Sequence, residues 1–269
     1  MALGSSRCTH CIASNVAIFS FLVAGAFATG EHRAAAEGFR IQTKVFAGKE
    51  KKLPVSETTT LFRNGVVYDF LKKPQQTAVF RKPGGGAPGR FILISDSHSL
   101  RTEVSTEQLA GTMTKLRNWA AQQRDPFLQF AANPEFEESF DDTDGKLILA
   151  SHLENYTVTT TTADHPEELA EYKEFLDWYT QLNTLLSAGK IPPEPRLRLN
   201  AALARHQVVP QTVQLVRAGE DPLRAEHTFT WRLSKEDEKR IDGVQVALSS
   251  YKEVNNEEFL RLTQPKDTK

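Results

Sequence analysis

The sequence predicts an α+β domain whose core is a strongly curved antiparallel sheet, an unclosed β-barrel covered by helices, with a signal peptide ahead of it. Three observations lead to this fold class. Apolar residues alternate with period two in the first and last parts of the chain after residue 38, as in half-buried strands. Two longer segments between them have helical spacing. Strands that gather at both ends, rather than alternating singly with helices, favour an antiparallel sheet over a parallel βαβ fold.

The first 36 residues are typical of a secretory signal peptide. Arg7 supplies a positive charge, and residues 12–27 are apolar apart from small polar interruptions. Small residues at suitable spacing predict cleavage after Ala28 or after Ala36. The apolar run is shorter and more interrupted than the roughly 20 residues of a membrane span. We therefore expect cleavage rather than an N-terminal anchor, no membrane span afterwards, and a periplasmic or secreted protein.

The two cysteines of the chain, Cys8 and Cys11, both lie in this segment. Their C-x-x-C spacing alone would suggest redox chemistry or zinc binding. Because both thiols precede the apolar run, we expect them to leave with the signal peptide. The remaining chain would then depend on core packing rather than on disulfides for its stability.

Composition places residues 37–269 among ordinary folded domains and excludes one class of partner. The whole chain has 33 lysines and arginines against 34 aspartates and glutamates, and 39% of its residues are hydrophobic. That much apolar surface argues against general disorder. A near-neutral chain lacks the strong positive charge of a nucleic-acid-binding protein, so we expect no nucleic-acid partner. The length suits a single domain.

The first strands begin directly after residue 38. Alternate residues from Phe39 to Val45 are apolar or β-branched, so one face of this strand is expected to be buried. Asn64-Gly65 separates two β-prone runs, which is the strongest short-range signal for a hairpin. Phe91–Ile94 is apolar without alternation and predicts a central strand. We predict strands at residues 39–45, 57–63, 66–72, 77–81 and 90–95.

The middle of the chain predicts one helix and two further strands. Ser105 followed by Gln108 forms a capping box, and the apolar stripe that it opens ends before Asp125-Pro126. The pattern of residues 127–140 is ambiguous. A turn at Asp141–Gly145 then leads to strands at residues 147–149 and 155–162.

A long helical insertion is predicted at about 164–206. Its first helix spans Asp164–Ala188, with its inward stripe at Leu169, Tyr172, Leu176 and Tyr179. Three prolines then interrupt the pattern. Residues 197–206 fit either a short helix or an extended piece.

The last third of the chain predicts a return to strands. Residues 208–217 and 225–233 alternate, and residues 244–248 fit one more strand. His227 falls on the apolar side of its strand, where a hydrogen-bonded core histidine is more usual than a metal ligand.

The order of these elements resembles the LolA/LolB-like family of periplasmic lipoprotein carriers. The likeness rests on the exported start, the strand 39–45, the hairpin Leu61–Phe70, the run Arg90–Ser95 and the late pair of strands at 210–216 and 226–232. It covers most of residues 39–233 as an order of elements rather than as a residue motif. The chain departs from the family in lacking an opening helix before the first strand and in having a larger helical stretch at 164–206.

This resemblance implies that helices cover the mouth of the curved sheet and that its apolar concave face takes acyl chains. The candidate ligand-binding residues are Phe91, Leu93, Tyr156, Val158, Phe229 and Trp231. The expected function is that of an exported, carrier-like binding protein for an apolar ligand such as a lipid or a lipoprotein acyl chain. The alternative is an exported structural or protein-interaction domain whose core its own side chains fill. An internal cavity would distinguish the two.

Two polar motifs invite a chemical interpretation that their context does not favour. Asp96–Ser99 places an acid, two hydroxyls and an imidazole in sequence, but residues so close rarely converge as a catalytic triad. The acidic run Asp141–Gly145 lacks the first and last ligands of a calcium loop. We interpret both as turns, and we expect no catalytic residues, metal, cofactor or enzymatic activity.

Overall fold

The computed structural model describes residues 38–48, 53–163, 165–187 and 191–263. All of them belong to the second of two units into which the chain divides, Ala36–Lys269. The predicted signal peptide and both of its cleavage positions lie outside the described residues.

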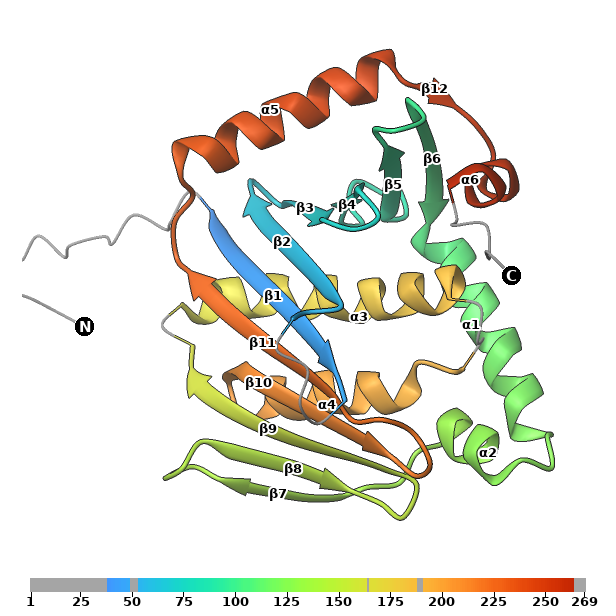
Figure 1. Ribbon diagram of the computed structural model, residues 1–269, viewed down its shortest axis with the longest axis vertical. Helices are drawn as coiled ribbons and strands as arrows, with labels where there is room; N and C mark the ends of the chain where they lie inside the picture. Colours follow the sequence, from blue (N-terminus) through green and yellow to red (C-terminus); the bar gives the residue numbers. More distant parts are fainter. Residues whose placement is uncertain (1–37, 49–52, 164, 188–190, 264–269) are drawn as a thin grey trace, which may run out of the picture. The chain divides into compact units, whose positions relative to one another are not determined.

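The described residues form twelve strands and six helices (Figure 1). The strands are β1 (Phe39–Ala47), β2 (Ser56–Arg63), β3 (Val66–Leu71), β4 (Gln76–Arg81), β5 (Arg90–Ser95), β6 (Leu100–Ser105), β7 (Glu137–Asp141), β8 (Lys146–Ala150), β9 (Glu154–Thr162), β10 (Val208–Arg217), β11 (Leu223–Thr230) and β12 (Lys252–Glu253). The helices are α1 (Thr106–Ala121), α2 (Pro126–Ala132), α3 (Pro166–Leu186), α4 (Glu194–Arg205), α5 (Lys235–Ser250) and α6 (Asn256–Thr263).

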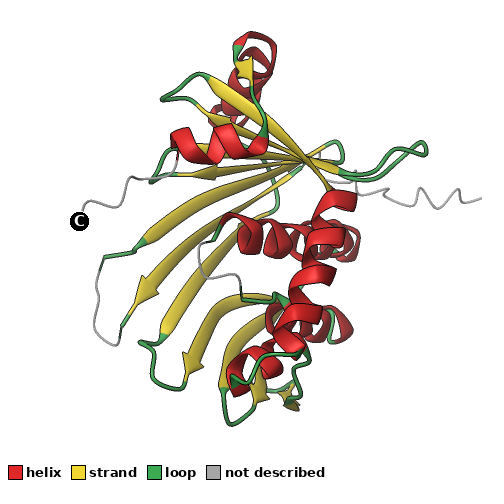
Figure 2. Ribbon diagram, turned by 90° about the vertical axis from the view of Figure 1, so that its right-hand side faces the viewer, coloured by secondary structure: helices red, strands yellow, loops and turns green. Residues whose placement is uncertain are grey.

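All twelve strands belong to one sheet, in the order β12-β6-β5-β4-β3-β2-β1-β11-β10-β9-β8-β7. Every neighbouring pair is antiparallel except β12 and β6, which are parallel. The sheet has two edges, β12 and β7, and is therefore not closed into a barrel. Figure 2 shows it bending around helices that lie on one side. The expected α+β class with a large, unclosed and mainly antiparallel sheet is thus confirmed.

The hairpin predicted at Asn64-Gly65 joins β2 to β3. Asn64 has φ 52° and Gly65 has φ 71°, and Arg63 pairs with Val66 across the turn. Two consecutive residues with positive φ are the geometry that suits the right-handed twist of paired strands. This turn fixes the register that brings Phe62 and Val67 onto the same face.

The main core lies between one face of this sheet, here called the helix-facing face, and α3. Phe39, Phe62 and Phe91 point from the sheet into this core, and each is at most 1% exposed. Phe175 of α3 meets Phe62 edge-on at 5.6 Å between ring centroids, and Leu182 is fully buried beside it. The helix therefore packs across the sheet with its apolar stripe inward, as the spacing of its residues predicts.

Helix α4 settles the alternatives for residues 197–206. Leu199, Ala202 and Leu203 recur at helical spacing and are buried against β8, β9 and β10. Burial of this stripe selects the helix over an extended piece. The ambiguous residues 127–140 divide into two elements, since the carboxylate of Asp125 caps α2 and the chain then enters strand β7.

The opposite face of the sheet is covered by α5, and the strand predicted at residues 244–248 is wrong. These residues lie within α5. The side chain of Ser234 accepts from the backbone of Asp237, whose carboxylate accepts in return from the backbone of Ser234, so a capping box starts the helix. Ile241 and Val244 then pack on the opposite face of β3, β4 and β5. Tertiary burial of a helical stripe overrides the local β-propensity of residues 244–248.

The chain end described here folds against β6. Thr102 donates to the side chain of Asn256 at 2.7 Å, and Phe259 of α6 is fully buried. The sequence gives no strong signal for α6 or for the two-residue strand β12. No helix within residues 38–48, 53–163, 165–187 and 191–263 has the length and apolar character needed to cross a bilayer.

Candidate functional site

A cavity of about 640 Å³ lies between the helix-facing face of the sheet and α3. From the sheet it is lined by Ile41, Thr43, Val45, Ser56, Thr58, Thr60, Asp69, Leu71, Tyr156, Val213, Leu215, Arg217, Leu223, Ala225 and His227. From the helical side it is lined by Tyr172, Phe175, Leu176, Tyr179, Thr180, Asn183, Thr184, Ser187, Ile191, Pro192, Pro193, Pro195 and Arg196.

The cavity exists because side chains on the helix-facing face become smaller along the strands. At one end Phe39 pairs with Phe62, and their rings stack at 4.0 Å between centroids. Three positions further along β1 on the same face of the sheet, Val45 faces Ser56 on β2 and Ala225 on β11. Since the strands run side by side, loss of side-chain volume at adjacent positions of three strands leaves space under the helices.

The helical wall is built from the C-terminal half of α3 and the segment that leads into α4. Leu176 and Tyr179 face the cavity from α3, followed by the smaller Thr180 and Asn183. Residues 191–195 then contribute three prolines, which carry no N–H that would need a partner in an apolar wall. The lining as a whole combines aliphatic and aromatic residues with twelve residues whose side chains carry a hydroxyl, amide, imidazole or charged group, not counting three tyrosines.

One of these polar positions is a buried carboxyl on β3. Asp69 is 2% exposed and accepts from the hydroxyls of Thr60 and Tyr179, both at 2.6 Å. Burial raises the pKa of Asp69, while these two hydrogen bonds act in the lowering direction. Burial also raises the pKa of Tyr179, with the charge of Asp69 as a second cause. The hydrogen bond from Tyr179 links the middle of α3 to the sheet, and the two hydrogen bonds together give the buried carboxyl of Asp69 its partners inside the protein.

A second polar position combines His227 on β11 with Arg196 on α4. The Nδ1 atom of His227 lies 3.0 Å from the hydroxyl of Thr43, and its Nε2 atom, shielded from water, has no partner among the described residues. Burial, and secondarily the positive charge of Arg196, lowers the pKa of His227 to about 3. His227 is therefore neutral at physiological pH. Its ring is hydrogen-bonded to Thr43, as the sequence predicts, and it stands in the cavity wall.

The third polar position is an ion pair where β9 begins and β10 ends. The Nε atom of Arg217 donates to Glu154 at 2.6 Å, and Glu154 is fully buried. Arg217 lies 5.5 Å above the ring of Phe127. Burial raises the pKa of Tyr156, with the negative charge of Glu154 as the next cause. The two charges of the pair thus compensate each other inside the protein.

The six predicted ligand-binding residues are distributed over two core clusters. Tyr156 lines the cavity, whereas Phe91 and Leu93 are packed under α3 and Val158 is packed under α4. Phe229 and Trp231 are half-buried at the aromatic end of the main core, and their rings stack on each other at 5.7 Å.

Among the described residues that line the cavity, the sequence interpretation named only Tyr156 as ligand-binding, and the polar residues Asp69 and Arg196 are two of those it missed. Asp69 stands between Tyr68 and Phe70 at a position that alternation assigns to the buried face, so a polar residue in an inward position was a usable signal. Arg196 follows a proline-rich stretch, and nothing in that local pattern indicates that its side chain turns into the cavity.

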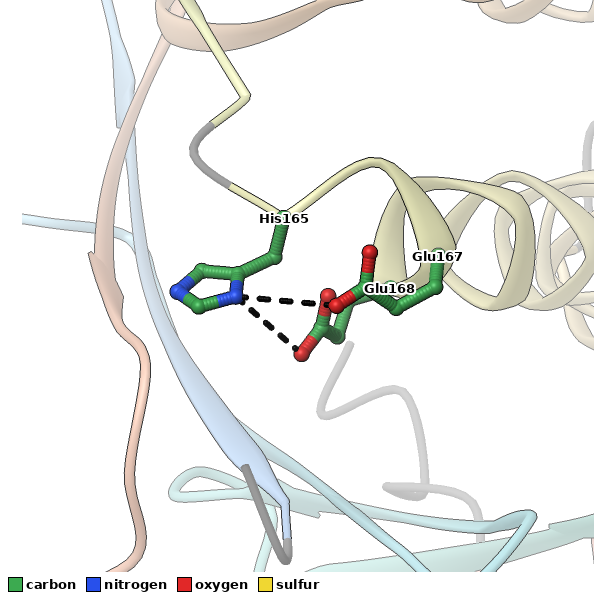
Figure 3. A group of neighbouring side chains, drawn as sticks. All are labelled: His165, Glu167 and Glu168. Carbon is green, nitrogen blue, oxygen red and sulfur yellow. Dashed lines mark ion pairs between the residues drawn. The ribbon is translucent and has the colours of Figure 1, made fainter. Parts of the chain in front are cut away.

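A cluster of ionisable groups stands apart from the cavity at the start of α3. The Nδ1 atom of His165 lies 3.6 Å from Glu168 and 3.8 Å from Glu167 (Figure 3). Burial raises the pKa of Glu168, and a backbone hydrogen bond is the main cause that lowers the pKa of Glu167. The three ligand atoms lie close enough to share a divalent cation. A protonated His165 between two carboxylates accounts for the same arrangement, so we treat it as an ion-pair cluster.

The two polar motifs form turns. His98 lies 3.0 Å from the hydroxyl of Ser95, but Asp96 accepts instead from Tyr251 at 3.1 Å, so acid and imidazole are not paired. The carboxylate of Asp141 accepts from the backbone of Thr143 and Asp144 in the β7–β8 turn. This is an Asx-type turn, and it directs the carboxylate of Asp141 to the backbone rather than to an ion.

A second hollow, of about 630 Å³, lies between α5 and the strands β1 to β5. Its walls carry Glu57, Lys72, Asp96 and Arg240 among others. Arg240 lies 4.2 Å above the ring of Phe70. With acidic and basic side chains in the same lining, this hollow is a poorer match to an apolar ligand than the cavity under α3.

No family model matches this chain, and no curated protein matches it. Among solved structures it is similar to the structure of PNGF-II in space group C2, with 11% sequence identity and a TM-score of 0.32. That similarity covers 82% of this chain and 31% of PNGF-II, so the chain spans about a third of the length of that protein.

Proposed function

We propose that this chain is an exported, carrier-like binding protein for an apolar ligand such as a lipid or the acyl chain of a lipoprotein. The observation that carries the proposal is the cavity of about 640 Å³ between the sheet and α3. Export is proposed from the N-terminal pattern of residues 1–36. The resemblance to LolA/LolB-like carriers in the order of elements agrees with both parts of the proposal.

The size and lining of the cavity support binding of one small amphiphile. Protein sites for small molecules occupy about 300–1,000 Å³ and are mostly apolar with a few placed polar groups. Ile41 and Val45 of β1 and Val213 and Leu215 of β10 supply apolar wall. Transfer of an alkyl chain from water to such a wall contributes about 25 cal/mol per Å² of buried apolar surface. A domain whose own side chains fill its interior would leave no such space, which favours the carrier over the interaction domain.

Filling the cavity should abolish binding of a neutral apolar probe. Ala225 lies on β11 with its side chain in the cavity, so Ala225→Trp should occupy the space that an alkyl chain would take. We expect the full chain to bind N-phenyl-1-naphthylamine with a rise in fluorescence. The Ala225→Trp variant should bind it about tenfold more weakly or not at all, since the lost apolar contact amounts to at least one tenfold step in affinity.

The matched control is Ala121→Trp, which places the same side chain at an exposed position at the end of α1. It should bind the probe like the wild type. Far-ultraviolet circular dichroism and thermal unfolding would establish that both variants are folded. If the wild type gives no saturable binding, or if the folded Ala225→Trp variant binds as well as the control, the proposal is wrong.

A further inference from the structure

Arg196 stands in the wall of the cavity with its side chain held in place from behind. Its Nε atom donates to the side chain of Asn200 at 3.1 Å, and Asn200 in turn donates to Asp177 at 3.0 Å. Asn200 is 1% exposed, so this support is rigid and buried. The chain of hydrogen bonds uses one of the five N–H donors of the guanidinium and leaves those on its two terminal nitrogens available.

The charge of Arg196 has no counter-ion in the part of the chain that the structure describes. No carboxylate there lies within ion-pair distance of it, whereas the other cavity arginine, Arg217, is bound to Glu154. Asp69, the carboxyl that lines the cavity, is engaged by Thr60 and Tyr179. Arg196 also lies in the first turn of α4, at the positive end of the helix dipole, where a cation is disfavoured. An unpaired, half-buried cation in this position is costly unless an anion joins it.

Three polar side chains of the cavity lie within the electrostatic range of Arg196. Its positive charge acts to lower the pKa values of Tyr156, Tyr172 and His227. The Nε2 atom of His227 is without a partner in the described part of the chain and is shielded from water. If the hydroxyl of Thr43 donates to Nδ1 of His227, the ring proton is on Nε2, which is then a hydrogen-bond donor. The charge of Arg196 therefore acts on side chains of the cavity on both the sheet and α3.

We infer that Arg196 binds the ionised acid head group of the ligand, so that the cavity takes a single-chain amphiphile with an oxyanion head. This inference rests on the proposed function. A planar guanidinium matches a carboxylate or a phosphate in a two-point contact, and a charged hydrogen bond inside a partly dry cavity is among the stronger polar contacts. The apolar walls of β1, β10 and β11 then take the alkyl chain.

Ligands with one chain length and different head groups test this assignment. The full chain loaded with N-phenyl-1-naphthylamine is titrated with hexadecanol, hexadecanoate or hexadecyl phosphate, each below its aggregation limit. We expect at least one of the two anions to displace the neutral probe at concentrations about 10- to 100-fold lower than hexadecanol does. The anion that competes at the lower concentration identifies the head group as a carboxylate or a phosphate.

Removal of the Arg196 charge should abolish this preference without abolishing binding. In Arg196→Met the anions and hexadecanol should compete equally, while Arg198→Met, an exposed arginine on the same helix, should behave like the wild type. If Arg196→Met does not fold, Arg196→Gln is used in its place, because it retains an amide donor for Asn200.

The outcomes separate this inference from the proposed function. If hexadecanol displaces the probe but neither anion is preferred, or if the preference survives in a folded Arg196 variant, the head-group assignment is wrong and the apolar site stands. If no amphiphile displaces the probe, both are wrong.

Discussion

Acidification from pH 7 to pH 5 is expected to cost the wild-type chain about 2 kcal/mol more of its free energy of unfolding than it costs the His227→Gln variant. The reason is the environment of His227, whose pKa falls from an ordinary value of 6.5 to about 3 on folding. Below pH 6.5 the unfolded state binds a proton that the folded state does not bind. The stability that this shift contributes is therefore fully present above pH 6.5 and is lost as the pH falls. The loss reaches about 5 kcal/mol near pH 3.

Urea unfolding at several pH values measures this difference directly. The His227→Gln variant keeps a polar side chain that can bond to Thr43 but does not titrate. The other histidines are the same in both proteins, so their contributions to the pH dependence cancel in the difference. His98→Gln, which changes an exposed turn histidine, is the control and should leave the pH dependence of the wild type unchanged. Parallel stability curves for wild type and His227→Gln between pH 7 and pH 5 would contradict the burial of an unprotonated imidazole.

The fold could be predicted from the sequence where a local pattern decides the structure. Alternation from Phe39 to Val45 and the Asn64-Gly65 turn reflect geometry within one strand or one hairpin, and the structure has both. The error in α5 arose from a five-residue window at residues 244–248 that favours strands. The capping box at Ser234 is the signal that decides for a helix, and it stands ten residues earlier. Strand β12 has two residues, too few for any period.

The cavity could not be predicted in the same way, because it is a difference in volume among residues distant in sequence. It depends on Val45 facing both Ser56 and Ala225, and that register becomes visible only when strands 180 residues apart are paired, as in Val45 with Ala225. The aromatic residues that a sequence marks as attractive for a ligand, such as Phe91, are large enough to fill the core instead. Space is left where side chains are small, a feature that no motif records.

Replacing Arg217 by methionine is expected to lower the free energy of unfolding by about 3–5 kcal/mol at pH 7. The change leaves Glu154, which is fully buried, without its cationic partner, and desolvation of an unpaired carboxylate is the dominant cost. Chemical denaturation of the full chain measures the loss. Lys72→Met breaks the exposed pair between Lys72 and Glu57 and should cost less than about 1 kcal/mol, because water screens that pair.

A double variant separates the worth of the pair from the penalty for an uncompensated charge. In Arg217→Met/Glu154→Gln no buried charge remains at this position, so most of the stability lost in Arg217→Met should return. A double variant as unstable as Arg217→Met would instead assign the loss to the contact between Arg217 and Phe127.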